Sequence, residues 1–228
     1  MGREDKYFKT LGDSALWKRY CGYLDYTIDE FMEVQHRLLM QQIDIISDSL
    51  LAKKILNGQK PRSVDEFRRT VPLTSYEDYE PHLSKMDEAA LAVKPLSWCH
   101  SSGRGGKFKW FPYTGEAAEV YSNIFISYLI LAATNRRDEV RIKPGQRILF
   151  NLAPRPYLSG FCLYSFTQAF SSRLMPPLEE AENMTFRERI QKGFQLALRE
   201  GVDVIFSISS ILVKAGERMA EQAQGTTY

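Results

Sequence analysis

Apolar residues recur at helical spacing through residues 27–57 of this chain, at Ile28, Phe31, Leu38, Leu39, Ile43, Ile46 and Leu50. Thr27 and Glu30 have the spacing of a capping box at the start of this run, and Gly58 follows its end. The pattern predicts one long helix over residues 27–57 that faces the core.

Shorter elements are predicted between this helix and residue 113. Ser63 begins a turn that runs through Phe67, and Ser75 is placed to cap a short helix in SYEDYEPHL, residues 75–83. The segments LAVKPLSW, residues 91–98, and FKWFPY, residues 108–113, have the character of strands. We therefore expect the glycine-rich stretch between them to join two extended segments.

Strands and helices alternate through the second half of the chain. Helices are predicted from Thr114 to about Ala133, near 160–171, from the Thr185 and Glu188 capping box to Glu200, and from about Ser209; strands are predicted at RILFNLA, residues 147–153, and VDVIFSI, residues 202–208. This alternation predicts an α/β layered fold with a mostly parallel sheet and flanking helices. We divide the chain, residues 1–228, into a helical lead-in, 1–66, and an α/β core, 67–228, of a single partial domain.

Composition limits the binding partners, the cysteine chemistry and the compartment that we expect for this protein. Lysine and arginine total 30 against 28 acidic residues, a net charge of +2, which is too balanced to indicate binding to nucleic acid or to a membrane. Cys21, Cys99 and Cys162 lie far apart without a CxxC pair, so a disulfide framework or zinc cluster is not expected. The N-terminus has no apolar leader segment, and we expect a cytoplasmic protein.

The stretch WCHSSGRGGKFKWFPYT, residues 98–114, combines serines, glycines and cationic side chains. Small residues let backbone N–H groups approach a ligand, and the side chains add donors and positive charge, so the loop is suited to phosphate. Its spacing is not that of a Walker loop, because Lys107 is followed by Phe108, nor that of a dinucleotide fingerprint, because no third glycine or helix follows.

The loop resembles the phosphate loop of adenylate-forming enzymes, roughly SSG[ST][ST]GKPKWIPYT, with matches at Ser101, Ser102, Gly103, Gly106, Lys107, Lys109, Trp110, Pro112, Tyr113 and Thr114. Upstream, FRRTVPLTSYEDYEPHL, residues 67–83, resembles the "vPlttYedyeP" segment of the auxin-responsive acyl-acid amido synthetases, and phenylacetate-CoA ligases are more distant relatives. Residues 201–219 are similar to the strand and helix that line the acyl pocket in these ligases.

This resemblance implies a fold like the N-terminal half of the large domain of an adenylate-forming ligase. It also implies a reaction, in which ATP with Mg²⁺ activates a small carboxylic acid as an acyl-adenylate that an amine or thiol then attacks. By the same resemblance Lys109 is the candidate catalytic residue. The candidate ATP-binding residues are Ser101, Ser102, Gly103, Arg104, Gly105, Gly106 and Lys107, and no metal ligand is assigned.

Two departures from the family pattern matter. Arg104 and Gly105 stand where the family has two hydroxyl residues, and Phe108 stands where it has proline. Arg104 has three interpretations. It compensates for the lost hydroxyls by binding phosphate, it occupies and obstructs the phosphate site, or it points to solvent.

The family's later motifs for adenine, ribose and the mobile C-terminal domain are not found in these 228 residues. We therefore expect this chain not to complete adenylation alone, and to associate either with itself or with a C-terminal half. The alternative is a catalytically silent module that keeps the fold and binds a nucleotide, an acyl ligand or a protein.

Three other groups of residues admit two interpretations each. His100 either contacts substrate or is structural. The carboxylates of Glu77, Asp78 and Glu80 form either an acid/base or metal cluster or a solvated helix face. The stripe of Tyr121, Phe125, Tyr128 and Leu131 lines either an acyl pocket or the core.

Overall fold

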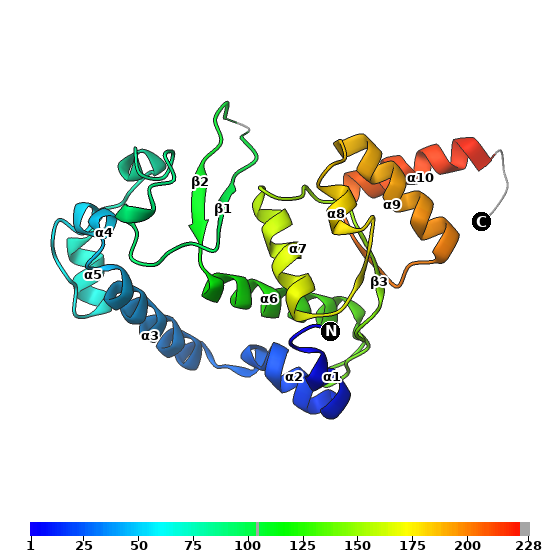
Figure 1. Ribbon diagram of the computed structural model, residues 1–228. Coiled ribbons are helices and arrows are strands. Elements are labelled where there is room, and N and C mark those ends of the chain that lie inside the picture. Colours follow the sequence, from blue (N-terminus) through cyan, green and yellow to red (C-terminus); the bar gives the residue numbers. More distant parts are fainter. Residues whose placement is uncertain (104, 224–228) are drawn as a thin grey trace.

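The computed structural model describes residues 1–103 and 105–223. Its helices are α1 (Asp5–Thr10), α2 (Asp13–Cys21), α3 (Ile28–Ile46), α4 (Leu50–Ile55), α5 (Val64–Thr70), α6 (Gly115–Ala133), α7 (Leu158–Ala169), α8 (Leu178–Ala181), α9 (Phe186–Glu200) and α10 (Ser209–Ala223), with 3₁₀ turns η1 (Gly22–Asp25), η2 (Tyr76–Tyr79) and η3 (Glu88–Ala90). Its strands are β1 (Ser97–His100), β2 (Trp110–Tyr113), β3 (Arg147–Phe150), β4 (Arg173–Met175) and β5 (Val204–Phe206). In Figure 1 the β1–β2 hairpin stands between the α3–α5 region and α7, while α8, α9 and α10 gather at the other end of the molecule.

Two separate sheets form. Strands β4, β3 and β5 lie side by side in that order and are all parallel, with Leu149 of β3 between Met175 and Ile205. Strands β1 and β2 pair antiparallel as a two-stranded hairpin. The α/β prediction is thus confirmed, with a parallel sheet of three short strands.

Helices cover both faces of the parallel sheet. Ile148 and Phe150 belong to a core that also contains Ile126 and Ile130 of α6 and Phe166 of α7. Side chains of alternate strand residues point to opposite faces, so Leu149 faces away from this core. It meets α9 at Gly193, where an added Cβ would lie only 2.9 Å from Leu149 Cδ1, so glycine permits the close approach of helix and sheet.

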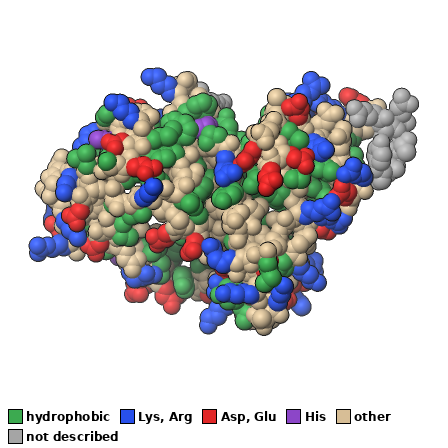
Figure 2. Space-filling view, viewed as in Figure 1, with side chains coloured by type: hydrophobic (Ala, Val, Ile, Leu, Met, Phe, Trp, Pro, Cys, Tyr) green, Lys and Arg blue, Asp and Glu red, His purple; other side chains and the backbone are tan. Residues whose placement is uncertain are grey.

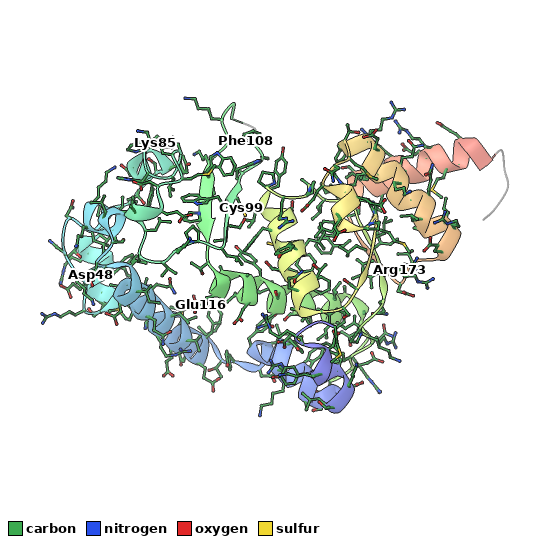
Figure 3. The ribbon with its side chains drawn as sticks, viewed as in Figure 1. Asp48, Lys85, Cys99, Phe108, Glu116 and Arg173 are labelled. Carbon is green, nitrogen blue, oxygen red and sulfur yellow. The ribbon has the colours of Figure 1, made fainter. Side chains whose placement is uncertain are left out.

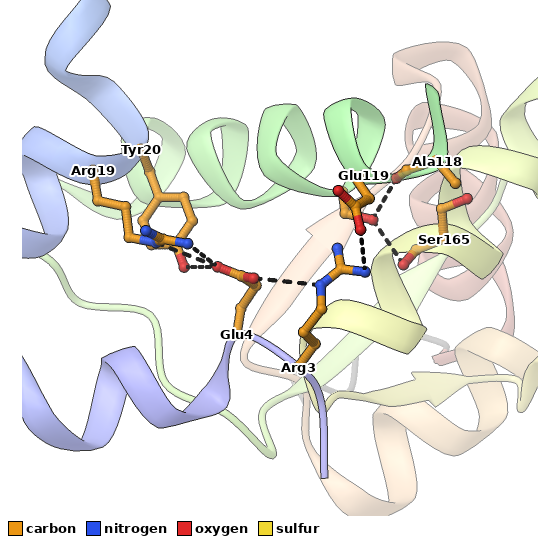
Figure 4. A network of polar contacts seen from close by, with 8 residues as sticks. Arg3, Glu4, Arg19, Tyr20, Ala118, Glu119 and Ser165 are labelled. Atoms are coloured by element: carbon orange, nitrogen blue, oxygen red, sulfur yellow. Dashed lines mark hydrogen bonds and ion pairs between the residues drawn. The ribbon is translucent and has the colours of Figure 1, made fainter. Parts of the chain in front are cut away.

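The N-terminus is fixed to this layer by a group that we call the N-terminal clamp: Glu4, Asp5, Arg19, Tyr20 and Ser171. Glu4 accepts hydrogen bonds from the Tyr20 hydroxyl (2.7 Å) and from the Arg19 guanidinium (2.9 Å), as Figure 4 shows. Asp5 accepts from the hydroxyl of Ser171 (2.6 Å) and from its backbone N–H (2.9 Å). The Glu4 bonds connect the first residues of the chain to α2, and the Asp5 bonds connect them to the segment that follows α7.

Burial by itself disfavours the charged forms of Glu4 and Asp5, which are 5% and 2% exposed. The hydrogen bonds from Tyr20 and Arg19, with the charge of Arg19, outweigh this and hold the pKa of Glu4 below its ordinary value. Hydrogen bonds from Ser171 likewise hold the pKa of Asp5 below its ordinary value. Both carboxylates are therefore stabilised as anions inside the protein.

The prediction of one long helix over residues 27–57 is wrong in two respects. The chain forms α3 and α4, separated at residues 47–49, because the Ser49 side chain caps a new helix by accepting from Ala52 N–H at 3.1 Å. The expected core-facing orientation also fails, since only Ile43 of α3 is buried and Ile28 is 77% exposed.

Several local predictions are confirmed. The capping boxes at Thr27 with Glu30 and at Thr185 with Glu188 both form, and Thr114 caps α6. Two predictions differ in extent. The strands are shorter than predicted, and the helix expected after Ser75 is only the short 3₁₀ turn η2. Across the described residues, no helix combines the length and apolar character needed to cross a membrane.

Candidate functional site

The glycine-rich stretch is the loop of the β1–β2 hairpin. Ser101 N–H donates to the Lys109 carbonyl (3.0 Å), and Lys109 N–H donates to Ser101 Oγ (3.2 Å), so the two residues close the neck of the loop. Gly106 N–H donates to the Gly103 carbonyl at 2.9 Å and forms a tight turn near the tip. The predicted loop between two extended segments is confirmed for its described residues.

Glycine is required at two positions of this loop. Gly103 and Gly106 have φ values of +67° and +92°, a region that other residues rarely adopt. A Cβ on Gly103 would also lie 2.7 Å from the ring of Phe108. Among the described residues, and apart from the direct chain neighbours, no atom lies within 4 Å of a Cβ added to Gly105 or Gly106, so this side of their backbone is open to an approaching ligand.

The remaining predicted site residues differ in how exposed their side chains are and in whether they are already hydrogen-bonded. Ser102, Lys107 and Lys109 are exposed. The hydroxyl of Ser101 is partly engaged inside the loop by the Lys109 N–H. Arg104 lies outside the described residues, so the structure does not address its three interpretations.

His100 lies below the loop as a buried structural residue, 6% exposed. Its ring packs against Phe108, Tyr157 and Trp110 at centroid distances of 4.1, 4.5 and 4.8 Å. Its Nδ1 is 2.8 Å from the Ser101 carbonyl oxygen, and its backbone N–H donates to Pro156. Figure 3 places Phe108 on the loop above Cys99 of β1, and Figure 2 shows hydrophobic side chains gathered on the same face.

Tyr76, which sequence reasoning did not single out, joins the two motif segments. Its hydroxyl accepts from Trp110 N–H (2.9 Å) and lies 3.3 Å from the Trp110 carbonyl, to which it donates. The ring packs edge-on against Phe111, and Lys109 Nζ lies 5.2 Å from the ring centroid. In the sequence, the feature that could have identified Tyr76 is its position within the second motif, residues 67–83.

The loop that follows β3 lies against the base of the hairpin. Pro156 and Tyr157 contact His100, and a parallel bridge pairs His100 with Tyr157. At Gly160 an added Cβ would lie 2.0 Å from Arg155 N, so only glycine fits where α7 passes this loop. The carboxyl end of the parallel sheet is thereby held next to the phosphate-loop candidate.

The other candidates are the carboxylates at residues 77–80 and the aromatic stripe of α6. Asp78 accepts from Ser75 N–H at 2.6 Å, and this bond lowers the pKa of its exposed carboxyl. No group of three or more metal-ligating side chains was found in the described part of the chain, which includes Glu77 and Glu80. Phe125 belongs to the core and Tyr121 and Leu131 pack against it, whereas Tyr128 is 52% exposed.

Comparison with known proteins gives one clear result. No curated protein sequence matches the chain. A family model described as the GH3 family N-terminal domain matches residues 23–170, which include the Tyr76 segment, the hairpin loop, α6, β3 and α7 but not β4, α9 or β5. The chain therefore belongs to the GH3 family, the family of auxin-responsive acyl-acid amido synthetases.

Proposed function

We propose that this chain supplies the phosphate-binding part of an ATP-dependent acyl-acid ligase. In the reaction, a carboxylate oxygen of a small acid attacks the α-phosphorus of ATP, the bond to the β-phosphate oxygen breaks, and acyl-adenylate and pyrophosphate form. An amine or thiol then attacks the acyl carbon and AMP leaves. Membership of the GH3 family supports this class of reaction.

The hairpin loop would hold the β- and γ-phosphates as pyrophosphate departs. The backbone N–H of Gly105, the Ser102 hydroxyl and the Lys107 ammonium would act as donors that need little rearrangement. Lys109 would contribute its charge from the neck of the loop, where Tyr76 and β2 limit its position. The observation that carries the proposal is this open glycine backbone with two exposed lysines on a fixed hairpin.

Mg²⁺ fits this arrangement as a companion of ATP. The loop carries hydroxyl, amide and ammonium donors and no carboxylate. Mg²⁺ commonly retains several waters and binds through substrate phosphates. When bound, it would neutralise phosphate charge, while the loop residues orient the phosphate chain.

Calorimetric titration with pyrophosphate tests the role of the loop. We expect Lys107→Ala to weaken binding roughly tenfold, because a charge-assisted hydrogen bond contributes about 1.5–3 kcal/mol. Lys94→Ala removes an exposed lysine before β1 and should bind as the wild type does. Equal binding by wild type, Lys107→Ala and Lys109→Ala would exclude this loop as the phosphate site.

Substitutions at Arg104 distinguish an arginine that binds phosphate from one that obstructs the site. If the guanidinium binds phosphate, Arg104→Ala weakens pyrophosphate binding by roughly tenfold and Arg104→Thr gives an intermediate affinity. If Arg104→Thr binds more tightly than wild type, the arginine obstructs the loop.

Exchange of labelled pyrophosphate into ATP separates an incomplete ligase from one that works alone. We expect pyrophosphate binding without carboxylate-dependent exchange by the purified chain of 228 residues. Robust exchange would show that this chain holds all of the adenylation machinery.

A further inference from the structure

Helices α9 and α10 form an apolar groove at the end of the molecule opposite α3–α5 (Figure 1). The groove has a volume of about 540 Å³. Its apolar side chains are spaced four or eight residues apart, with Phe186, Ile190, Phe194 and Leu198 on α9 and Ile211 and Met219 on α10. Residues at this spacing share one face of a helix, so each helix presents an apolar stripe to the groove.

The groove is open along its length. Phe186 and Leu198, at the two ends of the α9 stripe, are 56% and 53% exposed, and residues 209–221 of α10 include no buried side chain. Small-molecule sites enclose most of their ligand, which this groove cannot do. The ridges of a third helix pack between helices with this spacing, and the α9 stripe is about 18 Å long at 1.5 Å per residue. The shape therefore fits a helix of about three turns.

The charged side chains that line the groove all have the same sign. Arg187 of α9 lies on one side, and Lys214 and Arg218 of α10 lie on the other. The described residues that line the groove include no aspartate or glutamate, and none of the ion pairs within residues 1–103 and 105–223 involves these three cations. Glu217 and Glu221 of α10 do not line the groove. An occupant with carboxylates on both flanks would complement this pattern.

A second copy of this chain matches the groove less well. Two α9–α10 grooves that face each other would bring their cations together, which repel. Helix α3 is the chain's own exposed amphipathic helix, but its acidic side chains at residues 29, 33 and 44 lie on the side opposite to Phe31 and Leu38. With its apolar stripe in the groove, α3 would point these carboxylates away from the cations.

We propose that the α9–α10 groove is a docking surface for an amphipathic helix of another protein, one whose apolar stripe is flanked by aspartate or glutamate. The partner's apolar side chains would cover the stripes of α9 and α10, and its carboxylates would pair with Arg187, Lys214 and Arg218, as in other complexes of a helix in a groove. The proposal goes beyond the ligase function and does not depend on it, because the groove and the hairpin loop share no residue.

Fluorescence anisotropy with a synthetic helical peptide tests this surface. The labelled probe has about 16 residues, enough to span the α9 stripe, with leucine every three or four positions, glutamate on both flanks and alanine elsewhere. The control peptide has lysine in place of each glutamate. The purified chain should bind the glutamate peptide and not the lysine peptide, and binding should weaken as salt is raised, because salt screens exposed charges.

Reversal of the groove's charge should reverse this preference. Lys214→Glu combined with Arg218→Glu should weaken binding of the glutamate peptide at least about tenfold, which corresponds to about 1.4 kcal/mol, and should strengthen binding of the lysine peptide. Arg68→Glu combined with Arg69→Glu changes the net charge equally on α5 and should bind as the wild type does. All four side chains are exposed, so we expect both variants to fold. Equal binding of the glutamate peptide by wild type and both variants would overturn the proposal, as would no binding by the wild type.

Further measurements identify the occupant. Leu198→Ser removes an exposed apolar side chain and should weaken peptide binding, and the peptide should slow amide hydrogen exchange in α10, which has no buried side chain in residues 209–221. A chain that sediments as a dimer, and as a monomer after Lys214→Glu with Arg218→Glu, would assign the groove to a second copy. Displacement of the peptide by decanoate at similar concentration would assign it to a small amphiphile. Pyrophosphate affinity should be the same in all these variants, so the result is separate from the role of the phosphate loop.

Discussion

The N-terminal clamp and the carboxyl end of the parallel sheet both bury charged or polar side chains, but only the clamp pairs them. Glu4 and Asp5 are held by hydrogen bonds from Tyr20, Arg19 and Ser171. Arg189 of α9, at the carboxyl end of the sheet, has an exposed fraction as small as theirs and an unpaired Nε among the described residues. A paired buried charge fixes a fold, whereas an unpaired one lowers its stability.

Glu4→Gln should have the largest effect, because it removes the negative charge that Arg19 and Tyr20 face. We expect a loss of about 2–3 kcal/mol in the free energy of unfolding, below the full value for a buried pair because the Arg19 side chain is 37% exposed. Urea denaturation at neutral pH measures it. A loss below about 0.5 kcal/mol would show that the clamp is not a stabilising feature.

Tyr76→Phe should have an intermediate effect. It leaves the Trp110 N–H without its 2.9 Å acceptor, a loss of about 1 kcal/mol. Because the hydroxyl positions β2 next to Lys109, pyrophosphate affinity should fall as well. Tyr79→Phe, in the same turn, is the matched control, and equal behaviour of the two variants would contradict the positioning role of Tyr76.

The surface pair of Arg147 and Asp203 should matter less, and its contribution to stability should be lost in acid. Hydrogen bonds from Arg147 lower the pKa of Asp203 from 3.8 to about 2. A lowered pKa gives stability that is fully present above pH 3.8 and is lost as the pH falls through about 2.

Asp203→Asn should therefore reduce the pH dependence of the unfolding free energy between pH 4 and pH 2. Its stability at neutral pH should drop by no more than about 1 kcal/mol, as for exposed ion pairs. Unfolding curves across this pH range check both expectations. An unchanged acid slope would assign acid sensitivity to other carboxylates, such as Glu4 and Asp5.

Asn151→Leu should cause the smallest change, and in the opposite direction. Asn151 directly follows β3 and is fully buried, with neither Nδ2 nor Oδ1 paired within the described residues. Leucine has a similar size and places no polar atom at this position, so we expect no loss of stability and a gain of up to about 1 kcal/mol. Urea denaturation in the absence of ligand is the measurement. A clear loss would mean that Asn151 has a structural partner and would remove the contrast with the clamp.

The candidate site was predictable to the extent that it is local in sequence. The order of Ser101, Gly103, Gly106, Lys107 and Lys109 indicates a phosphate loop, and the hairpin has the predicted position. Tyr76 could not be assigned a role, because its hydrogen bonds to Trp110 span 34 positions. The burial of Arg189 could not be predicted at all, since an arginine on an amphipathic helix is ordinarily exposed.

The sequence by itself determined the features that depend on neighbouring residues. Thr27 with Glu30 and Thr185 with Glu188 begin helices because side chain and backbone satisfy one another within one turn. Helix α9 ends at Gly201, where the backbone turns to a positive φ that glycine adopts without strain. The alternation of β3, α7, α9 and β5 likewise follows from local pattern.

Only the tertiary structure decided which faces are buried and which distant residues meet. The apolar stripe of α3 was predicted to face the core, yet it is largely exposed. Periodicity indicates that a helix has an apolar face, but burial depends on what packs against that face. The three-residue strand β4 exists because β3 pairs with it. Asp5 meets Ser171 across 166 positions, and Arg189 becomes buried when α9 packs on β3 and β4, contacts that no local pattern contains.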